Sequence, residues 1–164
     1  MTIRKQLEVM LADAPGELAK LTDTLNDEHV NIEAMSIQDA NEYLRALYDV
    51  RSQTGRRVAP LEYYEAILKE SANYSMIRLI TDDPAKAVDA LTKAGYQVKV
   101  HDVLGIVLDN RPGQLNRVSK MLGDAGVNIR YTYGSGFSHS EEALFIFRVS
   151  DVEKALAMFP DGKL

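Results

Sequence analysis

Apolar residues alternate with polar or small ones from Leu7 to Leu11 near the start of the chain. This period of two predicts a β-strand with one buried face. After a short turn, Leu18, Leu21 and Leu25 recur at three- and four-residue spacing, which predicts an amphipathic helix. The chain is therefore expected to begin with a strand, a tight turn and a helix.

The same pattern returns 97 residues later, since Leu7 corresponds to Leu104 in an alternating stretch that ends at Leu108. The second helical stripe contains Leu115, Val118 and Leu122, and Val30-Asn31-Ile32 returns as Val127-Asn128-Ile129. Such agreement over about 25 positions, with both elements and the turn preserved, predicts an internal duplication.

Further along, the spacing between the copies changes. The first copy continues with a buried strand at 76–81 and a helix from Pro84. The second continues with a strand at 144–150 and a helix around Lys154. In these elements the offset is 68 residues, because Lys86-Ala87 corresponds to Lys154-Ala155. The first copy therefore holds 97 minus 68, or 29, extra residues, which we place within 41–73.

This insertion has the pattern of a helical hairpin interrupted at 54–60. Its apolar residues recur at three- and four-residue spacing in two groups: Tyr43, Leu44, Leu47 and Tyr48, then Leu61, Tyr64, Ile67 and Leu68. Two interpretations stay open. The stripe packs on the parent module, or it forms an oligomer contact or a lid, because tyrosine is enriched where surfaces meet.

The C-terminal ends of the copies differ. The first copy has a further strand pattern around Val98 and Val100, whereas the second has only five residues beyond Phe159. We expect the second copy to lack most of its last strand, so that one sheet edge is either covered by a neighbour or exposed.

The order strand, helix, strand, strand, helix, strand predicts an α+β fold with two ferredoxin-like βαββαβ modules. The first module spans 1–101 and the second 102–164. In each, two helices cover one face of a four-stranded antiparallel sheet. The other face must then be partly polar or pack against the insertion, another module or a second subunit.

The turns Asp13-Ala14-Pro15-Gly16-Glu17-Leu18 and Asp109-Asn110-Arg111-Pro112-Gly113-Gln114-Leu115 are the main candidates for chemistry. A Pro-Gly pair between a strand and a helix exposes backbone N–H groups at the positive end of the helix, which a carboxylate or phosphate can approach. Each turn taken alone is also explained as ordinary turn or capping chemistry.

Composition excludes several classes of site and partner. The chain has 19 basic and 24 acidic residues, for a net charge of −5 without long blocks, which disfavours nucleic acid or an anionic membrane as partner. It contains no cysteine, so disulfides and thiolate metal sites are excluded. We find no signal peptide or membrane span, and expect a cytoplasmic protein.

Other candidate sites are weaker. His29, His101 and His139 lack metal-ligand spacing, and we expect no metal and no cofactor. Asp82 and Asp83 precede a proline and are expected to cap a helix rather than form a catalytic carboxylate pair. We therefore predict no catalytic residues.

The strand that contains Tyr131 and Tyr133 is followed by Gly134-Ser135-Gly136. The two tyrosines share one face and are expected to be core or interface aromatics. The glycine pair is a hinge rather than a phosphate loop, because no Lys-Ser or Lys-Thr follows and the next element is a strand.

An apolar strand, Asp/Asn-x-Pro-Gly-x-Leu, an amphipathic helix and Val-Asn-Ile together resemble the ACT domain, a module that senses small molecules in amino-acid metabolism. Both copies carry this combination, at 13–32 and 110–129. The chain resembles stand-alone tandem ACT proteins that bind amino acids. The resemblance covers most of the chain except the insertion.

The resemblance implies a ligand between two ACT modules, held by the turn and by the strand that begins at Val-Asn-Ile. Carried over by position, the residues are Asn110, Pro112, Gly113 and Asn128 in the second copy, and Asp13, Pro15, Gly16 and Asn31 in the first. Asn128 matches the strand asparagine that serine-sensing members use. In the turn, Asp13 stands where the second copy has Asn110, and so departs from the asparagine of serine-sensing members. Asn31 and Asn128 also have a simpler interpretation as turn residues.

A free amino acid requires donors for its carboxylate and acceptors for its ammonium, and an asparagine amide supplies both. The Gly113 and Gln114 N–H groups are expected to bind the carboxylate, with Asn110 and Asn128 at the ammonium or a hydroxyl. Asp13 is an acceptor only at neutral pH, so the two sites are expected to differ. The second site is the stronger candidate.

We therefore expect a non-enzymatic, allosteric regulator that binds a small amino acid at ACT module interfaces and forms a homodimer. One alternative is an interaction or dimerisation module without a ligand. Another is a small acylphosphatase-like hydrolase, for which the turn around Arg111 is the one place that suits a phosphate site. Sequence does not identify the amino acid or the regulated partner.

Overall fold

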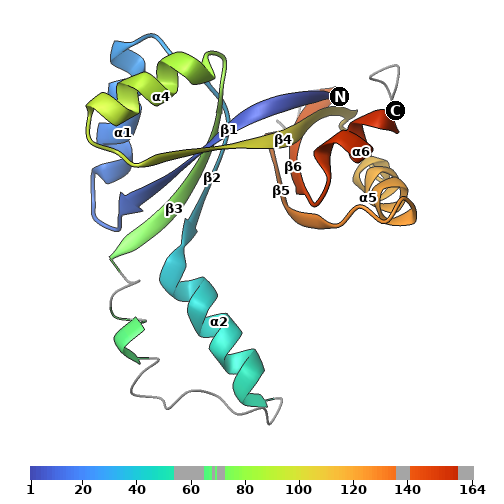
Figure 1. Cartoon of the computed structure of the whole chain (residues 1–164), viewed down its shortest axis with the longest axis horizontal. Coiled ribbons are helices and arrows are strands. Elements are labelled where there is room, and N and C mark those ends of the chain that lie inside the picture. The colour runs from blue at the N-terminus through green and yellow to red at the C-terminus, as the bar shows by residue number, and fades with distance from the viewer. Residues whose placement is uncertain (54–64, 68, 70–72, 136–140, 159–164) are drawn as a thin grey trace.

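The computed structural model describes residues 1–53, 65–67, 69, 73–135 and 141–158. Its strands are β1 (Thr2–Ala12), β2 (Ile32–Asp39), β3 (Tyr74–Thr81), β4 (Val98–Asp109), β5 (Ile129–Ser135) and β6 (Glu142–Val149). Its helices are α1 (Glu17–Asp27), α2 (Ala40–Gln53), α4 (Pro84–Lys93), α5 (Gln114–Asp124) and α6 (Val152–Ala157). The predicted α+β class is confirmed (Figure 1).

All six strands belong to one antiparallel sheet with the order β2-β3-β1-β4-β6-β5. The predicted alternation sets which residues face the helices. The first core contains Leu7, Val9 and Leu11 with Leu21, Leu25, Ile77, Leu79 and Leu91. The second contains Leu104, Ile106 and Leu108 with Val118, Leu122 and Phe147. Each copy therefore packs its own pair of helices on its own part of the sheet.

Strand β4 belongs to both copies. Its first half, from Val98, pairs with β1, and its second half, from Leu104 to Asp109, pairs with β6. The expected last strand of the first copy and first strand of the second are thus one continuous strand (Figure 1). The expected module boundary between residues 101 and 102 falls inside it. Sharing this strand gives the two copies one uninterrupted sheet.

We expected the sheet of the second copy to be short at the edge where its last strand is missing, and β1 lies at that edge. Thr2 pairs with Gly105 and Lys5 pairs with Asp102, so the N-terminal part of β1 lies along β4 on the side away from β6. In a βαββαβ module this is the place of the last strand. The N-terminus of the chain therefore completes the sheet of the second copy, while residues 159–164 lie outside the described part of the chain.

The sheet curls, so that the two halves of its helix-free face cover each other. In a flat sheet, β1 and β5 would be about 14 Å apart, because they are separated by three strand spacings of about 4.8 Å. Instead, the side chains of Gln6 on β1 and Tyr131 on β5 are hydrogen-bonded at 2.6 Å, and the edge strands β2 and β5 contact each other. The sheet is strongly curled, with its helices outside and a concave face inside. We call this inner surface the concave face.

A third apolar cluster lies on the concave face and joins the two copies. It contains Ala34 and Ile80 from the first copy together with Val103 and Ile146, all buried. Tyr133 and Leu144 pack against it. The helix-free face of each copy therefore packs against that of the other copy within the same chain.

Part of the insertion is described. Helix α2 continues directly from β2 and points away from the sheet (Figure 1). Leu47 and Val50 on it are 43% and 61% exposed, so the parent module does not cover this part of the stripe. Residues 65–67 and 69 are also helical, whereas Leu61, Tyr64 and Leu68 lie outside the described residues. The hairpin as a whole stays a prediction.

Candidate functional site

The two Pro-Gly turns have the same backbone conformation. Gly16 has φ 88° and ψ −10°, and Gly113 has φ 92° and ψ −17°, so both are left-handed. This conformation strains any residue with a Cβ atom, which explains why glycine occupies both positions. The predicted turns are thus present, each directly before a helix.

Backbone hydrogen bonds in the turns repeat with the same spacings as the sequence. The Glu17 N–H donates to the Ala14 carbonyl at 3.3 Å, and the Gln114 N–H donates to the Arg111 carbonyl at 3.4 Å. The Asp13 N–H donates to the Asn73 carbonyl at 2.8 Å, and the Asn110 N–H donates to the Glu141 carbonyl at the same distance. The duplication therefore extends to the hydrogen-bonding pattern of the candidate site.

Each helix start is accessible. Gly16 and Gly113 are the N-cap residues of α1 and α5, and glycine has no side chain to accept from the first helical N–H groups. Both glycines and the preceding Pro15 and Pro112 are exposed. A Cβ atom added at either glycine would meet nothing within 4 Å. The turns therefore offer open space next to the positive end of a helix.

Asn31 and Asn128 occupy matching places, just before β2 and just before β5. The Asn31 N–H donates to Asp82 Oδ1 at 2.9 Å, and the Asn128 N–H donates to Ser150 Oγ at 3.0 Å. Their carbonyls accept from the N–H groups of Asp82 and Ser150. Both asparagines are exposed, with their main chains fixed by a neighbouring loop.

The carboxylates at the start of α4 have different roles. Asp83 is the N-cap and accepts from the Lys86 N–H at 3.0 Å, as predicted. Asp82, which we also expected to cap the helix, accepts instead from the main chain of Asn31 and from the Asp83 N–H. It therefore holds the start of β2 in place.

A single module does not bring its turn and its asparagine together. Gly16 precedes α1 and Asn31 follows it, so the two are separated by the length of an 11-residue helix, about 16 Å. The two turns follow β1 and β4, which are antiparallel and point in opposite directions. The ligand roles of these residues stay a prediction.

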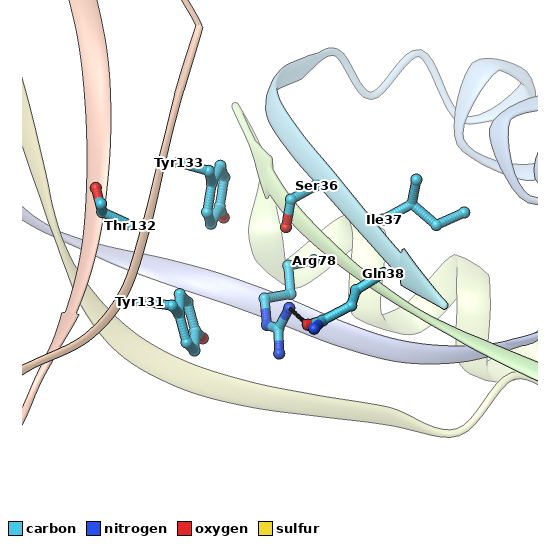
Figure 2. A pocket seen from close by; sticks show the side chains of 7 residues that line it. All are labelled: Ser36, Ile37, Gln38, Arg78, Tyr131, Thr132 and Tyr133. Carbon is cyan, nitrogen blue, oxygen red and sulfur yellow. Dashed lines mark hydrogen bonds between the residues drawn. The ribbon is translucent and has the colours of Figure 1, made fainter. Parts of the chain in front are cut away.

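A pocket lies elsewhere, on the concave face between the edge strands β2 and β5. Its volume is about 260 Å³, and it is lined by Ser36, Ile37, Gln38, Arg78, Tyr131, Thr132 and Tyr133. Figure 2 shows Arg78 between Gln38 and Tyr131, with Ser36 facing Tyr133, while Ile37 and Thr132 point away. The pocket therefore combines side chains from both copies.

One wall of this region is a buried network around Gln6. The Gln6 side chain is fully buried, donates from Nε2 to Tyr131 Oη at 2.6 Å and accepts at Oε1 from Tyr133 Oη at 3.0 Å. The two rings are stacked, with centroids 6.5 Å apart. Burial raises the pKa of Tyr133, and the neighbouring Tyr131 adds to the effect, so its hydroxyl stays protonated.

Arg78 is the one charged residue among those that line the described pocket. Its guanidinium lies 4.3 Å above the centroid of the Tyr131 ring, a cation–π distance. Its Nε is 3.4 Å from Glu8 Oε2, and the two side chains are only 13% and 17% exposed. The terminal nitrogens have neutral acceptors, Gln38 Oε1 at 3.4 Å and Met76 Sδ at 2.9 Å.

Sequence reasoning placed Tyr131 and Tyr133 on one face, which is confirmed, but it missed Gln6 and Arg78. The available signal was the polarity of the face opposite the alternating leucines, where Gln6 and Glu8 lie on β1. Which strands would meet across that face depends on the curl of the sheet. That property has no local sequence pattern.

The histidines have separate structural surroundings. His29 has φ 54°, the left-handed position at the end of α1 that Gly126, with φ 69°, takes after α5. His101 Nε2 lies 3.7 Å from Glu8 Oε1, and His139 lies outside the described residues. Within the described ranges, no group of acidic residues and histidines could hold a metal ion. In the same part of the chain, no helix is long and apolar enough to cross a membrane.

Solved structures similar to this chain are known. Protein BT0572 from Bacteroides thetaiotaomicron is 26% identical, with a TM-score of 0.70 over 97% of this chain and 88% of that chain. The regulatory subunit of aspartate kinase from Thermus thermophilus, in its ligand-free form, is 15% identical, with a TM-score of 0.55 over 98% and 95%. The corresponding subunit from Thermus flavus is 14% identical, with a TM-score of 0.54 over 98% and 94%. The two aspartate kinase subunits share the fold.

No curated protein sequence matches the chain. The family model described as "ACT domain pair" matches residues 57–164, about two thirds of the chain. This match includes the second Pro-Gly turn, the second Val-Asn-Ile and all of strand β4. The chain therefore belongs to the ACT domain pair family.

Proposed function

We propose that this protein is a regulator without catalytic activity of its own, and that it binds a small amino acid at its ACT turns. The observation that carries the proposal is the duplicated turn. Two left-handed glycines, at Gly16 and Gly113, present an accessible helix start in the same conformation, and each copy fixes an exposed asparagine at the same place.

The second turn has the better chemistry for an amino acid. The start of α5 lies next to open space at Gly113, and a carboxylate there gains roughly 0.3 to 1 kcal/mol from the helix dipole. The Gln114 N–H makes only a long bond of 3.4 Å, so a charged acceptor competes well for it. Asn110 and Asn128 supply amide oxygens for the ammonium.

The first turn has a carboxylate where the second has an amide. Asp13 accepts from Ser75 Oγ at 3.5 Å, a distance too long for a strong hydrogen bond. A carboxylate at this position repels the carboxylate of an incoming amino acid and attracts its ammonium. We therefore propose that the second site binds more tightly than the first.

A complete site requires modules from two chains. Because the turn and the asparagine of one module lie at opposite ends of its first helix, a ligand that touches both kinds of element lies between modules. We propose a homodimer in which the turn of one chain meets the asparagine of the partner chain. The Thermus proteins of similar fold are regulatory subunits of aspartate kinase, which supports a regulatory role.

The test is calorimetric titration and thermal unfolding of the full chain with each of the twenty amino acids, combined with sedimentation to measure its oligomeric state. At 100 times its dissociation constant, a ligand adds roughly 2.7 kcal/mol to the free energy of unfolding. Asn128→Ala should weaken binding more than Asn31→Ala. The exposed Asn26→Ala on α1 is the matched control and should bind normally. Folded protein that responds to none of the twenty would refute the proposal.

A further inference from the structure

The pocket on the concave face is separate from both turns. It is lined from β2 and β3 of the first copy and from β5 of the second, whereas the turns follow β1 and β4. Its volume of about 260 Å³ lies below the usual range for drug-sized ligands, so it suits a molecule of a few heavy atoms. The amino-acid proposal makes no use of it.

Arg78 determines which charge the pocket prefers. Glu8 lies near its Nε from the side of β1, but the terminal nitrogens, Nη1 and Nη2, have only an amide oxygen and a thioether as acceptors. A thioether is a weak acceptor, and the amide contact at 3.4 Å is long. A carboxylate that replaced these two acceptors would gain two charge-assisted hydrogen bonds. The pocket is therefore prepared for an anion.

The other residues that line the pocket limit which further functional groups the bound anion can have. The residues that line the described pocket include no aspartate or glutamate, so an ammonium group would have no carboxylate partner there. The hydroxyls of Ser36 and Tyr131 suit a neutral oxygen, because Tyr131 accepts from Gln6 and keeps its own proton to donate. The stacked tyrosine rings provide apolar surface. These features favour an oxo acid over the amino acid of the same skeleton.

We propose that this pocket is a second ligand site, which binds a small 2-oxo acid with its carboxylate on Arg78 and its aliphatic part against the tyrosine rings. Because the lining comes from both copies, an occupant holds β2 and β5 together. The ligand thereby stabilises one arrangement of the two modules, which gives the site a means to influence the turns.

The experiment is thermal unfolding and calorimetric titration of the full chain with 2-oxoisovalerate, and with valine, which has the same carbon skeleton but an ammonium and a hydrogen in place of the oxo group. We expect the oxo acid to raise the unfolding temperature. We also expect valine, even in tenfold excess, not to displace it. In native protein, saturating 2-oxoisovalerate should shift the ring resonances of Tyr131 and Tyr133.

Two variants test the location. Arg78→Gln removes the cation, and Ser36→Trp fills the pocket from β2 without touching the pair formed with Glu8. Each should weaken 2-oxoisovalerate binding at least tenfold. Arg130→Gln is the matched control, because this exposed arginine directly precedes Tyr131 on β5 but is not among the residues that line the pocket. It should bind as the native chain does.

Failure of this proposal is distinguishable from failure of the amino-acid proposal. Absence of 2-oxoisovalerate binding, unmoved tyrosine resonances or full binding by folded Ser36→Trp would each overturn the second site. None of these outcomes bears on the amino-acid site proposed to involve Asn110 and Asn128. Conversely, Asn128→Ala should leave 2-oxoisovalerate affinity within twofold of the native value.

Discussion

Gln6 and Tyr131 lie 125 residues apart in the sequence, and a hydrogen bond of 2.6 Å joins their side chains. Gln6 belongs to the first strand of the first copy and Tyr131 to the edge strand of the second. The bond therefore crosses the concave face, and it forms because the curl of the sheet brings β1 and β5 close together. It also fixes the tyrosine rings that form one wall of the pocket.

Replacing Gln6 with leucine should lower the free energy of unfolding by about 1 to 3 kcal/mol, because two partly buried tyrosine hydroxyls lose their shared partner. The measurement is the midpoint of urea unfolding. Adding Tyr131→Phe and Tyr133→Phe to Gln6→Leu should recover part of the loss, since the unpaired hydroxyls are then gone.

The control for this change is Lys5→Ala on the same strand. Lys5 pairs with Asp102, but both side chains are about half exposed, and such a pair contributes at most about 1 kcal/mol. A Gln6→Leu variant no less stable than Lys5→Ala would contradict the assignment of Gln6 as the centre of a buried network.

Tyr133 should make the protein sensitive to alkali. Burial raises its pKa above the ordinary value of 10.0, so above that pH the unfolded chain releases a proton that the folded chain keeps. The unfolded state then binds fewer protons, and the free energy of unfolding falls as pH rises. Below pH 10.0 the contribution of Tyr133 is complete.

The measurement is urea unfolding of the native chain and of Tyr133→Phe from about pH 9 to 12, the range around an ordinary tyrosine pKa. The variant should show a shallower decline. Lys20 and Lys93 also have raised pKa values, because each is hydrogen-bonded to a carboxylate, and they act in the same direction. Both lysines remain in the variant, so the difference between the two curves reports Tyr133. Parallel curves would contradict the prediction.

Local patterns predicted most elements of the fold. The alternation from Leu7 to Leu11 and the stripe of α1 set the first core, and the 97-residue repeat predicted the second. The expected module boundary between residues 101 and 102 falls inside β4, which runs from Val98 to Asp109. Pairing with β1 along one half and with β6 along the other keeps β4 continuous, and no residue near residues 101 and 102 signals a break.

The candidate sites differ in how far sequence could predict them. Gly16 and Gly113 were found because a Pro-Gly turn recurs before a helix in both copies. The left-handed conformation that both glycines adopt is a local constraint of the same turn. The pocket around Arg78 was missed because its walls come from strands far apart in the sequence. Its polar residues become a site only when a curled sheet brings β2 to β5.

His29 is expected to be a site of stored backbone strain. It adopts φ 54° after α1, where the second copy has Gly126 in the same role. A non-glycine residue in this conformation costs roughly 1 kcal/mol. His29→Gly should therefore raise the free energy of unfolding by about that amount in urea unfolding. The reverse change, Gly126→His, should lower it, and equal effects of the same sign would contradict the assignment.

Gly113 and Gly123 form a matched pair at the two ends of α5. Gly113 is left-handed, with φ 92°, whereas Gly123 is helical, and neither position has an atom within 4 Å of an added Cβ. Gly113→Ala should therefore destabilise the protein by about 1 kcal/mol through backbone strain alone. Gly123→Ala should instead stabilise it by about 0.5 to 1 kcal/mol, because alanine favours the helix. Urea unfolding measures both, and effects of the same sign would contradict the backbone geometry of the second turn.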